Sequence, residues 1–86
     1  MTSYDEIARE HGPLIRRIAR SYEANGARAD ELVQDIHLAL WQALARYRGE
    51  ASVRTFVARV AHNRAISHVT REAREPRAVE LDGGLH

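Results

Sequence analysis

The chain has 86 residues, which limits it to one small domain, because a chain of this length buries only about 60–65% of its unfolded surface. Its formal net charge is +1, from 13 basic and 12 acidic side chains, and every basic one is arginine. This near balance gives no sign of a polyanion-binding protein. The absence of cysteine excludes disulfides, thiolate metal sites and cysteine nucleophiles, and it fits a reducing, cytoplasmic setting.

No segment of the sequence is typical of a membrane or secreted protein. The longest uncharged stretch, residues 36–45, is too short to span a bilayer. Residues 1–6 have neither the basic nor the apolar part of a signal peptide. We therefore expect no membrane partner.

The first predicted helix begins after Ser3. Ser3 and Glu6 have the spacing of a capping box, and apolar residues recur at helical spacing over residues 7–22. Gly12 and Pro13 interrupt the pattern, and Pro13 lacks the backbone N–H that an unbroken helix needs. The sequence predicts a helix with a kink at Gly12-Pro13.

The second predicted helix runs from about Ala29 to Arg46. Asn25 and Gly26 are expected to end the first helix, with Gly26 in the left-handed conformation. Acidic residues occupy the first turns of the second helix, where the helix dipole favours negative charge. These residues are Asp30, Glu31 and Asp35. Leu38 lies beside them, off the apolar stripe, either as an ordinary exposed leucine or as part of a partner-helix interface.

The third predicted helix covers residues 53–74, with Ser52 as its N-cap and Pro76 after its end. The core face of its first half consists of Val53, Phe56, Val57, Val60 and Ala61. Arg64 interrupts this face, so we expect the C-terminal half to project beyond the bundle or to bend. The apolar residues then expected to point elsewhere are Ala65, Ile66 and Val69.

These helices predict an all-α fold, a compact three- to four-helix bundle over residues 1–76, with residues 77–86 as a linker. The net charge conceals a dipolar molecule. Residues 1–45 carry five arginines and seven acids, whereas residues 46–77 carry eight arginines and three acids, and residues 78–86 add two acids. The basic segment suits phosphate contacts, although an ordinary solvated helix is the alternative.

The sequence carries no recognisable catalytic or metal-binding motif. His62 and His68 are six residues apart, on different sides of a helix, and the other histidines show no ligand spacing. There is no glycine-rich phosphate loop and no nucleophile elbow. We expect no enzyme activity, no metal and no cofactor. A small metal-dependent hydrolase that uses histidines and acids remains an alternative.

Three segments carry the most specific signal. Residues 29–36 read ADELVQDI, residues 48–57 read RGEASVRTFV and residues 59–68 read RVAHNRAISH. In the same order and at the same separations, they resemble the segments AEDLVQEV, RGEASFRTWL and RIARNRAIDH of extracytoplasmic-function (ECF) sigma factors. The resemblance covers residues 4–75, the domain called region 2. It implies a subunit that directs bacterial RNA polymerase to promoters.

The resemblance also implies two binding surfaces. In this family the second-helix signature binds the clamp helices of the polymerase β′ subunit, which implies a polymerase-binding set of Asp30, Glu31, Gln34, Asp35 and Leu38. The loop before the third helix and the exposed face of that helix recognise the −10 promoter element on the non-template strand. The implied DNA-binding set is Arg48, Gly49, Glu50, Ala51, Arg59, His62, Asn63, Arg64, Ser67 and Arg71. The amide of Asn63 offers one base edge both a donor and an acceptor.

The chain departs from the family pattern in places. His37 stands where the family commonly has Phe, Phe56 where it has Trp, and Ala58 where it often has Tyr, and Thr70 replaces one Arg of the basic end. The family's second domain, a helix-turn-helix that reads the −35 element, is expected after residues 77–86. The resemblance also implies an anti-sigma factor as a partner. The alternative function is a helical interaction module that binds polymerase or an anti-sigma factor without reading DNA.

Overall fold

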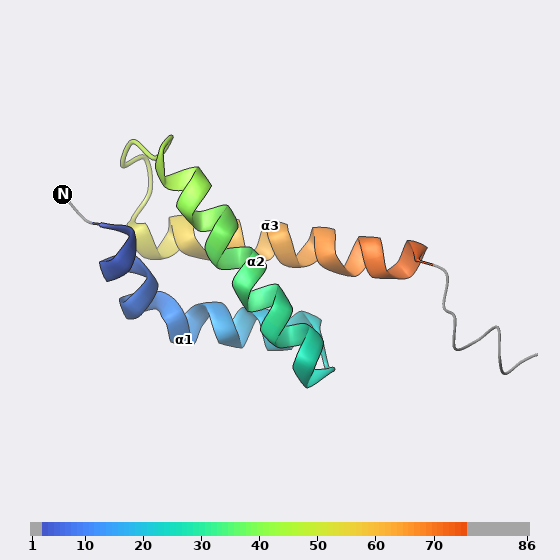
Figure 1. The fold of residues 1–86 in the computed structure, drawn as a ribbon. Coiled ribbons are helices and arrows are strands. Elements are labelled where there is room, and N and C mark those ends of the chain that lie inside the picture. The colour runs from blue at the N-terminus through green and yellow to red at the C-terminus, as the bar shows by residue number, and fades with distance from the viewer. Residues whose placement is uncertain (1–2, 76–86) are drawn as a thin grey trace, which may run out of the picture.

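The computed structural model describes residues 3–75, which form three helices (Figure 1). These are α1 (Tyr4–Tyr22), α2 (Gly26–Leu44) and α3 (Val53–Arg74). Each helix packs against both of the others, and α2 crosses the other two in the view of Figure 1. The predicted all-α bundle is confirmed, with three helices. No helix in this part of the chain is long and apolar enough to cross a membrane.

The capping box of α1 is present as predicted. Ser3 Oγ accepts a hydrogen bond from the backbone N–H of Glu6, and Glu6 Oε1 accepts one from the backbone N–H of Ser3. The helix continues through Pro13, and Figure 1 shows its first turns at an angle to the remainder. The missing N–H of proline explains such a bend.

The predicted start of the second helix is wrong. Asn25 is the N-cap of α2, where its side-chain oxygen accepts a hydrogen bond from the backbone N–H of Arg28 at 2.9 Å. Gly26 is the first residue of α2 and does not take the left-handed conformation. Among the described residues only Gly49 has a positive φ, of 81°. The Asn-Gly pair therefore begins a helix, because the asparagine side chain satisfies an amide that has no partner within the helix.

The earlier start of α2 changes the setting of its acidic residues. Its first turn contains no acidic residue, so Asp30, Glu31 and Asp35 all lie further along the helix. The dipole effect falls off within one turn and does not account for them. At the other end α2 stops at Leu44, so Arg46 lies beyond the helix and not in its last turn.

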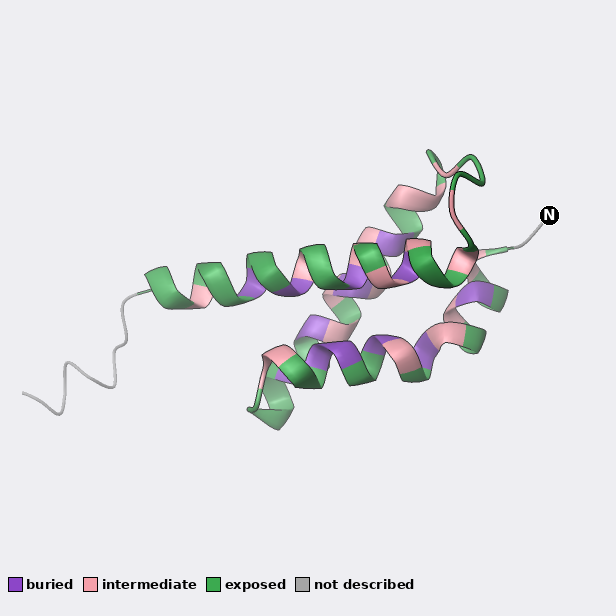
Figure 2. Cartoon of the chain, turned by 180° about the vertical axis from the view of Figure 1, so that it is seen from behind, coloured by how far each residue is buried: buried purple, intermediate pink, exposed green. Residues whose placement is uncertain are grey.

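The core lies where the three helices meet. Figure 2 shows the buried residues on the inner faces of the helices. The core residues are Ile7, Ile15, Ile18 and Ala19 of α1, Leu32, Ile36 and Leu40 of α2, and Val57, Ala61 and Ala65 of α3.

One prediction about the core face of α3 is wrong. Ala65 is fully buried, and Val57, Ala61, Ala65 and His68 form one continuous buried face. Arg64 does not interrupt this face, because it lies beside it. Ile66 and Val69, by contrast, are exposed, which agrees with the prediction that they point away from the core face.

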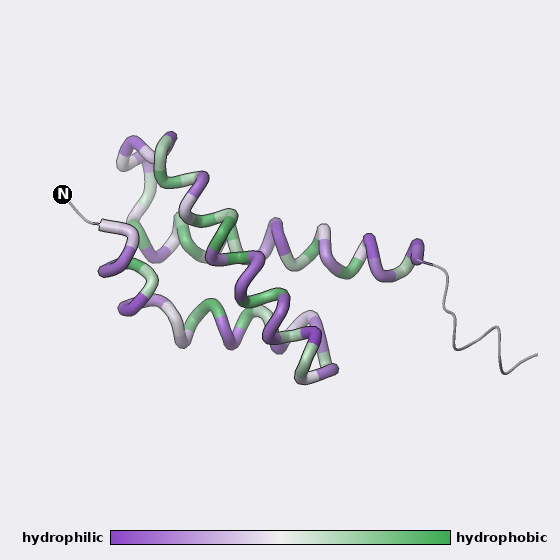
Figure 3. Tube along the Cα trace, in the orientation of Figure 1, coloured by the Kyte–Doolittle hydropathy of each residue, from purple (hydrophilic) through white to green (hydrophobic). Residues whose placement is uncertain are grey.

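The C-terminal half of α3 projects beyond the other two helices (Figure 1), as predicted. Glu72 is half-buried, whereas the remaining residues of 69–75 are exposed. Hydrophilic positions recur along this half of α3 (Figure 3). Residues 77–86, predicted to be a linker, lie outside the described residues.

Candidate functional site

The outward face of α2 is partly polar and partly apolar. Asp30, Gln34 and Leu38 follow one another at helical spacing and are exposed, with Glu31 beside them. The face continues to Trp41, whose side chain is 60% exposed, compared with 51% for Leu38. Trp41 was not in the predicted polymerase-binding set, although its spacing from Leu38 places it on this face. An exposed Leu and Trp flanked by acids are typical of a protein-binding surface.

Asp35 differs from the other predicted polymerase-binding residues, because its carboxylate forms an ion pair with α3. Its Oδ2 accepts a hydrogen bond from Arg64 Nε at 2.9 Å, and its Oδ1 accepts one from Arg64 Nη2 at 3.0 Å. This two-bonded ion pair joins α2 to α3. Asp35 comes from the predicted polymerase-binding set and Arg64 from the predicted DNA-binding set, so one residue of each set is engaged within the domain.

The loop between α2 and α3 is held by its own hydrogen bonds. The hydroxyl of Tyr47 donates to the backbone carbonyl of Ala51, and the backbone N–H of Arg48 donates to Glu50 Oε1 at 3.1 Å. Gly49 takes the left-handed conformation that favours glycine. Arg48, Gly49 and Glu50 are exposed, whereas Ala51 is half-buried. The loop thus has a defined shape with an accessible tip.

An apolar pocket of about 760 Å³ opens beside this loop. Tyr4, Trp41, Tyr47, Gly49 and Val53 are among the residues that line it. The pocket therefore connects the outward face of α2 with the loop before α3.

The outward face of α3 carries part of the predicted DNA-binding set. Arg59, Asn63 and Ser67 are all exposed and recur every fourth residue. Thr70 and Arg74 extend this face along the projecting turns and were not in the predicted set. Arg74 follows Thr70 by one helical turn, and this spacing in the sequence could have added Arg74 to the predicted DNA-binding set.

The other members of the set point to the sides of α3. His62 lies towards α1, with its Nδ1 2.9 Å from the hydroxyl of Tyr22. Arg64 lies towards α2 in the pair with Asp35. Arg71 is exposed and lines a pocket between α2 and α3. The ten predicted residues therefore do not form one surface.

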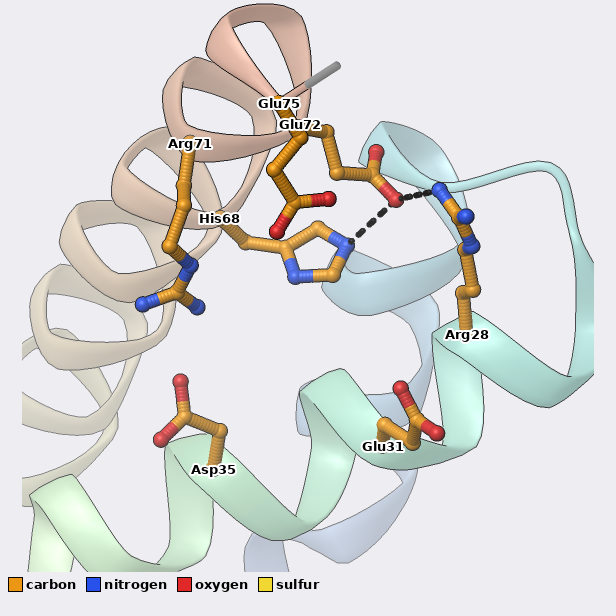
Figure 4. A pocket seen from close by; sticks show the side chains of 7 residues that line it. All are labelled: Arg28, Glu31, Asp35, His68, Arg71, Glu72 and Glu75. Atoms are coloured by element: carbon orange, nitrogen blue, oxygen red, sulfur yellow. Dashed lines mark hydrogen bonds and ion pairs between the residues drawn. The ribbon is translucent and has the colours of Figure 1, made fainter. Parts of the chain in front are cut away.

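That pocket, of about 350 Å³, is lined by His68, the one charged or polar residue that is buried as a whole among the described residues (Figure 4). His68 Nε2 lies 2.9 Å from Glu23 Oε1 and 3.5 Å from Glu72 Oε2, and Glu72 also pairs with Arg28. The pKa of Glu23 lies below its ordinary value, and the main cause is the hydrogen bond from His68. Histidine spacing alone missed this cluster, since Glu23 is the C-cap of α1 and does not lie on the helix of His68.

His37, at the position where ECF sigma factors commonly have Phe, is half-buried. Its Nδ1 lies 3.1 Å from the hydroxyl of Tyr4, which ties the start of α1 to α2. Burial, and after it the charge of Arg16, lowers the pKa of His37. The fold therefore favours the neutral ring.

Comparison with protein families gives a match over most of the chain. The family model for sigma-70 region 2 matches residues 7–75. Comparisons with curated proteins and with solved structures gave no match. Sigma-70 region 2 is not an enzyme family. It is the domain with which sigma factors bind RNA polymerase and DNA in transcription initiation. With its three-helix fold and a match over residues 7–75, the chain belongs to the sigma-70 region 2 family.

Proposed function

We propose that the chain is region 2 of an ECF sigma factor and that it recognises the −10 promoter element while bound to core RNA polymerase. The observation that carries this proposal is the division of its exposed residues between two helices. Acidic and apolar residues occupy the outward face of α2, whereas arginine and amide side chains occupy that of α3. The two faces belong to different helices, which pack against each other and against α1. One domain then contacts polymerase and DNA at the same time.

The DNA-binding face that we propose has Asn63 at its centre. Its exposed amide has the donor and acceptor needed to read one base edge. Arg59 and Ser67 lie one turn away on either side and are placed to contact the sugar-phosphate backbone. Arg74 extends the positive charge along the projecting end of α3.

The loop before α3 is the second proposed DNA contact. Its hydrogen bonds fix the backbone, and the exposed tip at Arg48, Gly49 and Glu50 is open to a base that has left the stack. Arg48 supplies positive charge for an adjacent phosphate.

The polymerase-binding face that we propose consists of Asp30, Glu31, Gln34 and Leu38, with Trp41 added. Carboxylates around two exposed apolar side chains suit a helical partner that carries arginine, such as the β′ clamp helices. In this proposal Asp35 acts by holding α3 against α2. An anti-sigma factor that covered the same face would compete with polymerase.

The experiment measures fluorescence anisotropy of labelled single-stranded DNA with the domain and core polymerase. We expect salt-sensitive binding that depends on the −10 sequence. Asn63→Ala is expected to lose discrimination at one base position, equivalent to about 1–3 kcal/mol. Arg17→Ala, an exposed change on α1, is the control and keeps the wild-type preference. No salt-sensitive binding, or an unchanged base preference in Asn63→Ala, would contradict the proposal and favour the interaction-module function.

A further inference from the structure

Three possible metal ligands meet between the C-terminal end of α1 and the projecting half of α3. His68 Nε2 faces Glu23 Oε1 at 2.9 Å and Glu72 Oε2 at 3.5 Å. One ligand atom from each of the three residues lies within 4.8 Å of the others. His68 and Glu72 are one turn apart on α3, and Glu23 caps α1. Two packed helices therefore hold the three groups in place.

The three groups are shielded from water to different degrees. The side chains of His68 and Glu23 are 11% and 10% exposed, and that of Glu72 is 24% exposed. Two carboxylates on one imidazole nitrogen repel each other unless a positive charge lies between them. A single proton on His68 Nε2 points to one carboxylate at a time, whereas a metal ion in its place bonds to both.

The ligand set matches the preferences of zinc. One imidazole nitrogen and two carboxylate oxygens bind Zn²⁺ at about 2.0–2.2 Å. In a tetrahedral site these bond lengths place neighbouring ligand atoms about 3.3 Å apart. The distances from His68 Nε2 to the two carboxylate oxygens, 2.9 and 3.5 Å, lie on either side of that value, and all three ligand atoms lie within 4.8 Å of one another.

The surroundings also suit a cation. His68 and Glu72 line the pocket in Figure 4, so an ion and a water ligand can enter from that side. Besides His68, the lining carries four carboxylates and two arginines, so negative charge predominates in the pocket. Arg28 pairs with the same oxygen, Glu72 Oε2, so a bound ion would share this oxygen with Arg28 or displace the guanidinium from it.

We propose that Glu23, His68 and Glu72 bind one divalent transition-metal ion, with zinc as the best match. The ion would fasten the end of α1 to the part of α3 that extends beyond the bundle. Binding at this cluster is independent of promoter recognition, because none of the three residues lies on the outward faces assigned above.

The experiment titrates the metal-free 86-residue chain with zinc against a coloured chelator and follows thermal unfolding in parallel. We expect one zinc ion per chain and a melting temperature that rises with zinc concentration. Cobalt(II) is a second probe, because a tetrahedral site with nitrogen and oxygen ligands gives it visible absorption bands.

The variants separate a built site from scattered surface binding. Glu72→Gln keeps the side-chain shape and is expected to weaken zinc binding at least tenfold, as is His68→Gln. His11→Gln is the matched control on α1 and keeps wild-type affinity. If His68→Gln fails to fold by circular dichroism, Glu72→Gln decides the outcome. No uptake at millimolar zinc, or uptake that Glu72→Gln leaves unchanged, would overturn the proposal.

Discussion

The ion pair between Asp35 and Arg64 fixes how α2 and α3 pack beside the core, and its contribution can be measured. Its two hydrogen bonds are 2.9 and 3.0 Å long, and the side chains of Asp35 and Arg64 are 27% and 41% exposed. Ion pairs with this exposure contribute about 0.2–1 kcal/mol, and two-bonded geometry favours the upper end. We predict a coupling energy of about 1 kcal/mol, or about 4–8 °C in melting temperature for a domain of this size.

The assay is a double-mutant cycle of Asp35→Asn and Arg64→Gln, measured by urea unfolding and circular dichroism. The coupling energy is expected to decrease in about 1 M salt, where the Debye length is only about 3 Å. Arg17→Gln, combined with Asp35→Asn, is the control pair and is expected to be additive. Additivity of Asp35→Asn and Arg64→Gln within about 0.3 kcal/mol at low salt would refute the reasoning.

Two further changes test local features of the fold. The fold lowers the pKa of His37, so the folded state binds a proton less readily and stability decreases as the pH falls below the ordinary histidine value of about 6.5. Between about pH 7.5 and pH 5.5, the melting temperature of the wild type should therefore decrease more than that of His37→Phe. An equal decrease in the two proteins would show that His37 is not the source of the pH dependence. Gly49→Ala has free space around the new methyl group but requires a positive φ, so we predict a loss of about 1–2 kcal/mol in urea unfolding. Gly26→Ala is the control: it also has free space around the new methyl group but lies at the start of α2, so it should not destabilise the domain. Equal stability of the two variants would refute the explanation that the positive φ of Gly49 requires glycine.

The sequence predicted the helices well where local signals are unambiguous. The caps at Ser3 and Ser52 were placed correctly, because the hydrogen bonds that define a cap lie within a few residues. Asn25 and Gly26 were misplaced because this pair is found at both ends of helices. Which end it forms depends on the amide that the asparagine side chain meets, here that of Arg28.

Long-range contacts were the part that the sequence did not reveal. Asp35 pairs with Arg64, 29 residues away, and His68 meets Glu23, 45 residues away. Helical periodicity places a residue on a face, but it does not say which face of another helix lies opposite. Ala65 was missed for the same reason, since only the packing of the bundle shows that the core reaches it.

The most direct test of two separate binding faces is site-specific photocrosslinking in a complex with core polymerase and promoter DNA. A photoreactive residue replaces Asn63 in one protein and Gln34 in another, both at exposed positions. We predict that the probe at position 63 crosslinks to the non-template strand within the −10 element, and that the probe at position 34 crosslinks to the β′ subunit. Crosslinks from position 63 to protein alone, or from position 34 to DNA, would contradict the assignment of the two faces.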